Sequence, residues 1–153
     1  MLVPRSQSRR FHLDAPRGRV FALFTARGER EWAPYWDPVM LSGAEERGSV
    51  FQTCSDGRTT TWIVVEYLPA AGRVSYARLA HGSNMGLVDV ICTAAAAGGT
   101  DVSVAYTLTP LNAGAEAFVD AFVDPQQYDR MIDAWHEATT AALARLPPAP
   151  RLP

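Results

Sequence analysis

The side chains in this sequence that are best suited to ligand binding are its large aromatic residues. The chain of 153 residues contains four Trp and five Tyr. A buried indole N–H or phenol O–H needs a hydrogen-bond partner, and a ligand can supply one. A large aromatic on a strand or helix is nevertheless more often a plain core residue. The residues selected as candidate ligand contacts are Trp32, Trp36, Trp62, Tyr76, Tyr106, Tyr128, Met131 and Trp135.

Trp32 and Trp36 lie four positions apart in a loop that is constrained by Pro34 and Pro38. Two roles stay open for this pair: contact with a ligand, or a hydrophobic plug that closes one end of the core. Three acids flank the two tryptophans: Glu29, Glu31 and Asp37. Because Asp37 precedes Pro38, we expect its carboxylate to form an Asx-type turn and to be structural.

Acids inside apolar strands are the other candidates for chemistry. Asp89 interrupts such a run, and a carboxylate buried there without a partner would have a raised pKa. It would be the best acid or base if it faced inward. The opposite parity places Val88, Val90 and Cys92 inside, so we expect Asp89 on the convex, solvent-facing side. The same argument applies to Glu66.

Metal and cofactor motifs are absent from the sequence. The three histidines, His12, His81 and His136, are scattered and no pair has ligand spacing. Cys54 and Cys92 both lie in apolar strand-like segments, which favours small core residues over a disulfide or a zinc site. No Gly-x-Ser-x-Gly elbow, phosphate loop or Gly-x-Gly-x-x-Gly fingerprint occurs. We therefore expect no metal, nucleotide or other cofactor.

The length and composition describe the molecule that must position these residues. A chain of this size, with 48% hydrophobic and 20% charged residues, predicts one globular domain over 1–153, with loose tails at 1–8 and 147–153. The net charge of −2 offers no basic field for nucleic acid. No apolar run approaches membrane-spanning length and no secretion signal is recognisable. These features predict a cytoplasmic protein without stable membrane insertion.

The periodicity of the sequence predicts the order of elements. A short strand over Arg9–Asp14 precedes a helix that starts near Pro16, and Gly28 breaks that helix before a further turn or two. The period then changes to two, and short turns join the strand-like runs, so these form an antiparallel meander. The predicted strands are Ser49–Cys54, Thr59–Tyr67, Arg73–Leu79, Gly86–Ala95 and Thr100–Thr109.

Helical spacing returns after Pro110. Asp124-Pro125 predicts a kink or a restart, with Gln127 at the capping-box position. The second helical piece, of roughly 21 residues, would be about 30 Å long and would cross the whole sheet. One face of the last strand is apolar, because Val102, Val104 and their neighbours of equal parity are hydrophobic. We expect the long helix to cover that face.

The order of these motifs resembles the START-like, or SRPBCC, superfamily with its helix-grip fold, and in particular bacterial members near polyketide cyclases and Hsp90-activator-like domains. The resemblance covers nearly the whole chain. It implies an α+β protein with a curved antiparallel sheet of about six strands around a long C-terminal helix, and two short helices between strands 1 and 2. It also implies a hydrophobic cavity between sheet and helix. The motifs are Phe11-His-Leu-Asp-Ala-Pro16, Val20-Phe21-Ala-Leu-Phe24, Glu29 to Pro38, Gly48-Ser-Val-Phe51, Thr61-Trp62 and Trp135.

Three functions are compatible with the resemblance. The first is binding of a small hydrophobic ligand of the lipid, polyketide or aromatic type in the cavity. The second is a cyclase or dehydratase that uses the same cavity, which requires at least two titratable groups converging on one spot. The third is an Hsp90-activator-like interaction module, which requires a filled core and an exposed apolar patch. The polar candidates are scattered, which favours binding without catalysis. The exposed sheet edges leave a homodimer possible.

Overall fold

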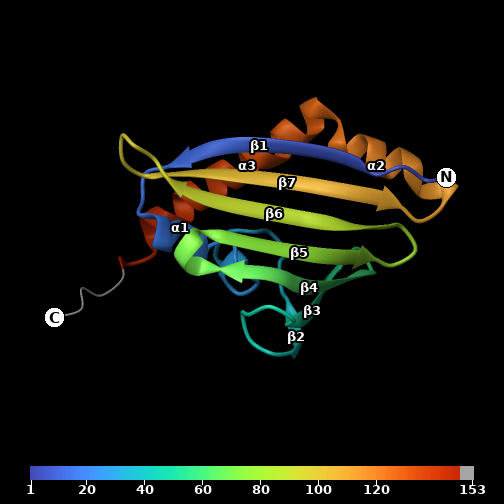
Figure 1. The fold of residues 1–153 in the computed structure, drawn as a ribbon, viewed down its shortest axis with the longest axis horizontal. Coiled ribbons are helices and arrows are strands. Elements are labelled where there is room, and N and C mark those ends of the chain that lie inside the picture. Colours follow the sequence, from blue (N-terminus) through green and yellow to red (C-terminus); the bar gives the residue numbers. More distant parts are fainter. Residues whose placement is uncertain (149–153) are drawn as a thin grey trace.

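A single curved antiparallel sheet dominates the fold (Figure 1). The computed structural model describes residues 1–148. Within these residues the sheet has seven strands in the order β1-β7-β6-β5-β4-β3-β2. The strands are β1 (Arg5–Leu13), β2 (Val39–Ser42), β3 (Val50–Ser55), β4 (Arg58–Leu68), β5 (Arg73–Ala80), β6 (Asn84–Ala94) and β7 (Thr100–Pro110). The helices are α1 (Arg17–Ala22), η1 (Gly28–Glu31), η2 (Pro69–Ala71), η3 (Ala113–Ala115), α2 (Glu116–Val123) and α3 (Pro125–Arg145).

The predicted meander is present as β3 to β7. Its clearest signal is β7, in which buried and half-buried residues alternate along the entire strand. Val102, Val104 and Leu108 on the concave face are fully buried. The β3–β4 hairpin turns at Asp56-Gly57, where both residues have positive φ (50° and 72°), as a tight two-residue hairpin turn requires.

The sheet has one strand more than the sequence predicts. The missed strand, β2, has four residues, mostly exposed, and pairs only with β3 at the edge of the sheet. It follows directly on Pro38. A segment this short, with little buried surface, has no alternation of apolar and polar residues by which it could be recognised.

The prediction of a loose tail at residues 1–8 is wrong from Arg5 onward. β1 begins at Arg5 and pairs with β7 along its length. Its inward side chains at this end are polar, and the two arginines among them meet acids of the helices: Arg5 lies 2.8 Å from Asp120, and Arg9 lies 2.8 Å from Asp133. Ion pairs, in place of apolar contacts, cover this end of the strand, so the sequence carries no apolar alternation there.

The C-terminal helices follow the predicted restart. α2 ends at Val123, and α3 begins at Pro125. The Asp124 side chain caps α3 by accepting a hydrogen bond from the Gln127 N–H at 3.1 Å. α3 has 21 residues and packs against β1 (Figure 1). Of the predicted tail at 147–153, Pro147 and Pro148 are exposed coil and the remainder lies outside the described residues.

The two short helices predicted between the first two strands are α1 and η1. Gly28 begins η1 close against the end of α1: a Cβ at this position would lie 1.7 Å from the Ala22 carbonyl oxygen. A residue with a side chain would therefore push η1 away from α1. No helix in residues 1–148 is long and apolar enough to cross a membrane.

Candidate ligand-binding cavity

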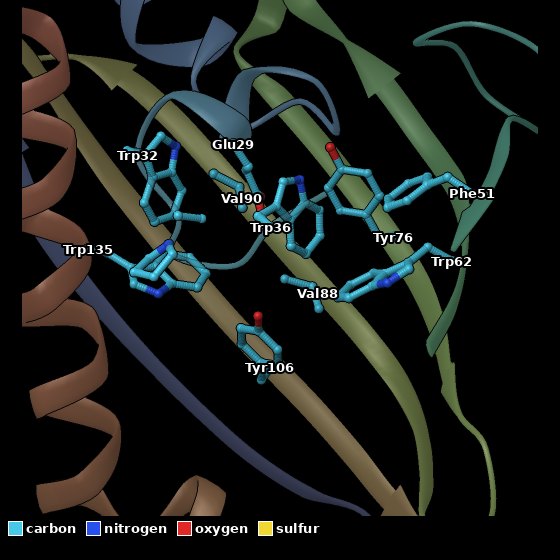
Figure 2. A pocket seen from close by; sticks show the side chains of 12 residues that line it. Glu29, Trp32, Trp36, Phe51, Trp62, Tyr76, Val88, Val90, Tyr106 and Trp135 are labelled. Atoms are coloured by element: carbon cyan, nitrogen blue, oxygen red, sulfur yellow. The ribbon is translucent and has the colours of Figure 1, made fainter. Parts of the chain in front are cut away.

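A cavity of about 190 Å³ lies between the concave face of the sheet, η1 with the loop that follows it, and α3. Aromatic side chains form most of its wall (Figure 2). The strands contribute from β3, β4, β5, β6 and β7, and α3 contributes Trp135. The complete lining is Glu29, Trp32, Ala33, Pro34, Trp36, Phe51, Trp62, Tyr76, Val88, Val90, Tyr106 and Trp135.

Six of the eight side chains selected from the sequence line this cavity: Trp32, Trp36, Trp62, Tyr76, Tyr106 and Trp135. The structure does not bring Tyr128 and Met131 to it. Tyr128 is fully buried, and its hydroxyl donates to the Val104 carbonyl oxygen at 2.7 Å. Met131 is half-buried and packs against the core. Both residues belong to the packing between α3 and the sheet.

The aromatic rings hold one another in place. Trp62 stacks on Phe51 with ring centroids 5.7 Å apart and planes 4° from parallel. Trp36 meets Trp62 edge to face at 5.5 Å, and Trp32 meets Trp135 in the same way at 5.1 Å. Such pairs add about 0.5–1.5 kcal/mol each beyond the burial of their surface. The wall is therefore built from rigid rings in mutual contact.

Backbone carbonyls just after α1 fix three of these aromatic side chains. The carbonyls belong to residues at and beyond the C-cap of α1, outside the helix, and are free to accept other hydrogen bonds. Trp36 donates from a loop and Tyr76 donates from β5, so two distant segments are tied to one short stretch. The bonds run from Trp32 Nε1 to the Leu23 oxygen (2.6 Å), from Trp36 Nε1 to Ala26 (2.7 Å) and from the Tyr76 hydroxyl to Phe24 (2.7 Å).

Two polar groups of the lining differ from these. Within residues 1–148, neither the Glu29 carboxyl nor the Tyr106 hydroxyl has a hydrogen-bond partner. Figure 2 shows Glu29 extending from η1 toward the sheet, and Tyr106 pointing its hydroxyl into the same space. Neither group is among the fully buried unpartnered side-chain atoms, so their oxygens border the space of the cavity. Both groups are thus available to a molecule that enters the cavity.

The Glu29 carboxyl is held in an apolar setting. Its side chain keeps a moderate exposed fraction, yet protein atoms surround it, because the accessible part borders the cavity. Desolvation raises the pKa of Glu29 well above its usual value. Burial likewise raises the pKa of Tyr106, against a smaller opposing effect of the Arg78 charge. Glu29 therefore stays a neutral carboxylic acid to a higher pH than a free one, and both groups can donate hydrogen bonds.

Glu29 is not among the candidate residues predicted from the sequence, where it stands only as one of the acids that flank Trp32 and Trp36. Glu31 lies on the same turn but is exposed. Glu29 faces the cavity and Glu31 faces solvent because of the way η1 packs against α1. This packing depends on the close approach of Gly28 to the Ala22 carbonyl oxygen. The one sequence signal was that Glu29 precedes Trp32 by three residues, which places the two on one face of a helical turn.

The two strand acids lie away from the cavity. Asp89 is on the face opposite to Val88 and Val90, as predicted, and accepts a hydrogen bond from Ser75 Oγ. Glu66 lies beside Arg73, with Oε1 to Nε at 3.3 Å. Both carboxylates have partners at the outer surface of the sheet, so neither is an acid or base for the cavity.

The cysteines and histidines also have structural surroundings. Cys92 is buried, and desolvation raises the pKa of its thiol to about 12. The expectation that Cys54 is also a core residue is wrong: it lies near the end of β3 and is exposed. His12 bridges Asp101 and Asp14, with N–O distances of 2.8 and 3.1 Å. The described residues contain no group of three or more potential metal ligands.

A curved antiparallel sheet that grips one long C-terminal helix and leaves a cavity beside it defines the helix-grip fold of START-like proteins. The chain belongs to the family described as polyketide cyclase / dehydrase and lipid transport, whose model matches residues 5–146. The superfamily and the fold class predicted from the sequence are therefore confirmed, apart from the number of strands. Comparison with curated protein sequences gives no significant match.

Several solved structures share this fold at low sequence identity. An uncharacterised protein from Rhizobium leguminosarum superposes with a TM-score of 0.67 at 17% identity, covering 95% of this chain and 98% of the other. The major latex-like protein 151 from Panax ginseng gives 0.68 at 13%, covering 95% and 99%. Norcoclaurine synthase from Thalictrum flavum, in complex with dopamine and hydroxybenzaldehyde, gives 0.67 at 7%, covering 97% and 91%. At these identities the likeness establishes the shared fold.

Proposed function

We propose that this protein binds a small, compact hydrophobic molecule, of the size of one or two aromatic rings, in the cavity between the sheet and α3. The observation that carries the proposal is a cavity with an aromatic wall and two unpartnered polar groups, Glu29 and Tyr106. Pockets for small molecules have this character, mostly apolar with a few polar groups that fix orientation.

The size of the cavity narrows the class of ligand. Apolar cavities of roughly 150 Å³ hold benzene, whereas pockets for larger ligands have about 300–1,000 Å³. At about 190 Å³ the cavity suits a ring with one or two polar substituents. A long acyl chain would need the walls to move apart. The family description names polyketides and lipids, and the norcoclaurine synthase complex contains aromatic molecules in the same fold, so an aromatic ligand agrees with both.

Titration with phenol, indole and a long-chain fatty acid tests the proposal. Binding is followed by amide chemical shifts and by tryptophan fluorescence. We expect the two aromatic probes to shift signals of cavity residues, and the fatty acid to bind more weakly. Val88→Trp fills the cavity from β6 and should abolish binding. Leu87→Trp, on the outer face of the same strand, is the matched control and should leave binding intact. Equal binding by all three proteins would refute the cavity as the site.

A second candidate function is catalysis of proton transfer to or from the bound molecule. It is favoured by the presence of two titratable groups, Glu29 from η1 and Tyr106 from β7, that line the same cavity without protein partners. A neutral carboxylic acid in an apolar site is suited to act as a general acid, and its conjugate base as a general base. Cyclisation and dehydration of polyketide-type compounds use such steps.

Exchange of the α-protons of a small aryl ketone in D2O tests this second function. An enzyme should accelerate the exchange, and Glu29→Gln should remove the acceleration while the ketone still binds. Glu31→Gln, on the exposed side of the same turn, is the control. Binding of the ketone without accelerated exchange would leave only the first function.

A further inference from the structure

Arg78 is a largely enclosed cation that has no anionic partner. It follows Tyr76 by two residues on β5 and so faces the concave side. Within residues 1–148 no oxygen accepts a hydrogen bond from it, and its Nε atom is fully buried without a partner. Desolvation lowers the pKa of Arg78. Burying an unpaired charge is costly, and most buried charges in proteins are paired.

One contact offsets part of this cost. The Arg78 guanidinium carbon lies 5.2 Å from the centroid of the Trp62 ring, which is a cation–π geometry. A cation–π contact does not use the N–H donors of a guanidinium, and within residues 1–148 those of Arg78 form no hydrogen bond. Two such N–H donors of one guanidinium can bind the two oxygens of a carboxylate or phosphate at the same time.

Arg78 lies at the boundary between two hollows of the concave side. Trp62, whose ring it contacts, lines the cavity described above, which we now call the inner cavity. Arg78 itself lines a second pocket of about 410 Å³, the outer pocket, together with residues of the β3–β4 and β5–β6 turns. A molecule that fills the inner cavity and extends past the Trp62 ring therefore meets Arg78.

The two hollows differ in charge. The inner cavity contains the Glu29 carboxyl and no basic side chain. The outer pocket has two arginines, Arg58 and Arg78, together with His81. Its one acid, Asp56, is exposed on the β3–β4 turn and forms no ion pair with Arg78. An anionic group finds no cation in the inner cavity, whereas Arg78 offers one in the outer pocket.

We propose that the ligand is an aromatic carboxylate, with its ring in the inner cavity and its carboxylate paired with Arg78 in the outer pocket. This inference rests on the proposed binding function and specifies the class of ligand. A single enclosed guanidinium matches a monoanion in charge, and its planar pair of N–H donors matches the two oxygens of a carboxylate.

A pair of probes that differ only in charge tests the inference: 3-phenylpropanoate and 3-phenylpropanamide. The wild-type protein should bind the carboxylate at least about tenfold more tightly than the amide, as measured by titration calorimetry. Arg78→Gln should remove this preference by weakening the binding of the carboxylate by about the same factor. Arg58→Gln, which removes an exposed cation of the same outer pocket, is the matched control and should keep most of the preference.

Side-chain NMR of the wild-type protein gives an independent test that does not depend on a variant folding. The Arg78 Nε–H signal should shift on addition of the carboxylate and not on addition of the amide. Equal affinity of the wild-type protein for both probes, or an unchanged Arg78 signal at saturation, overturns the anion inference and leaves the binding function in place. Failure of the amide, phenol and indole to bind at all would instead overturn the binding function itself.

Discussion

The concave side of the sheet has two halves that are filled in different ways. In the packed half, β1 and β7 lie against α3, and Val104, Tyr128 and Ile132 are fully buried. In the hollow half, residues of β3 to β6 and Tyr106 of β7 lie beneath η1 and its loop and border the inner cavity. Figure 1 shows α3 behind β1 and β7, with β2 and β3 at the opposite edge of the sheet. One helix cannot cover the entire curved sheet, and the remaining part is roofed by aromatic rings.

Two neighbouring tyrosines show what the difference means for chemistry. Tyr106 and Tyr128 have ring centroids 6.2 Å apart. The Tyr128 hydroxyl belongs to the packed half and is bonded to a carbonyl oxygen, whereas the Tyr106 hydroxyl faces the inner cavity without a protein partner. The same residue type thus contributes to packing in the packed half, whereas in the hollow half its hydroxyl remains available to a ligand. The free polar groups mark the functional half more clearly than the aromatic rings do.

The comparison predicts that a Val→Ala substitution lowers the free energy of unfolding more in the packed half than in the hollow half. Val104→Ala in the packed half removes two methyl groups from a site without free space, and should lower the free energy of unfolding by about 2–3 kcal/mol. Val88→Ala in the hollow half enlarges an existing cavity, and should cost about 1 kcal/mol. Urea denaturation of both variants measures the difference. Equal losses would mean that the hollow half is as tightly packed as the other.

The Glu29 carboxyl in the hollow half should lower the stability of the folded protein, in contrast to the buried side chains of the packed half. Its pKa is raised in the folded protein by desolvation. At pH values below about 4.5 the carboxyl is protonated in both states and has no effect. As the pH rises from there toward the raised pKa, the unfolded chain ionises first and folding becomes less favourable. Above the raised pKa the loss is complete.

Glu29→Gln should therefore be more stable than the wild-type protein at neutral and alkaline pH, and the difference should shrink toward zero as the pH falls to about 4. Denaturation midpoints measured across this pH range provide the test. Glu31→Gln removes an exposed carboxylate from the same turn and controls for the change in net charge. A stability difference between Glu29→Gln and wild type that does not grow with pH would show that the Glu29 carboxyl is solvated.

The parts of the fold that the sequence predicts are those with local periodicity. The alternation along β7 and the proline restart before α3 are visible in short windows of sequence, and both are confirmed. The residues of β1 before Arg9 could not be predicted, because Arg5 is inward-facing and its partner, Asp120, lies more than a hundred residues away. Pairing of charges across such a distance leaves no signal in the local pattern.

The residues of the candidate site also fall into those that the sequence predicts and those that it does not. Large aromatics such as Trp36 and Trp62 could be selected by size and type alone, and the structure places them around one cavity. Glu29 and Arg78 could not be selected, because each is distinguished from other charged residues only by the absence of a partner. That property depends on the tertiary surroundings, such as the close approach of Gly28 to α1. Sequence reasoning thus finds the walls of a site more readily than its reactive groups.

The smallest expected effect distinguishes the two neighbouring tyrosines. Tyr128→Phe removes a hydroxyl that donates to the Val104 carbonyl oxygen, and should lower the free energy of unfolding by about 1 kcal/mol. Tyr106→Phe removes a hydroxyl without a protein partner, and should change stability by less than about 0.5 kcal/mol while weakening the binding of phenol. The same denaturation and titration experiments measure both. If Tyr106→Phe were as costly to stability as Tyr128→Phe and left phenol binding unchanged, the Tyr106 hydroxyl would belong to the packing, and the division into two halves would fail where they meet.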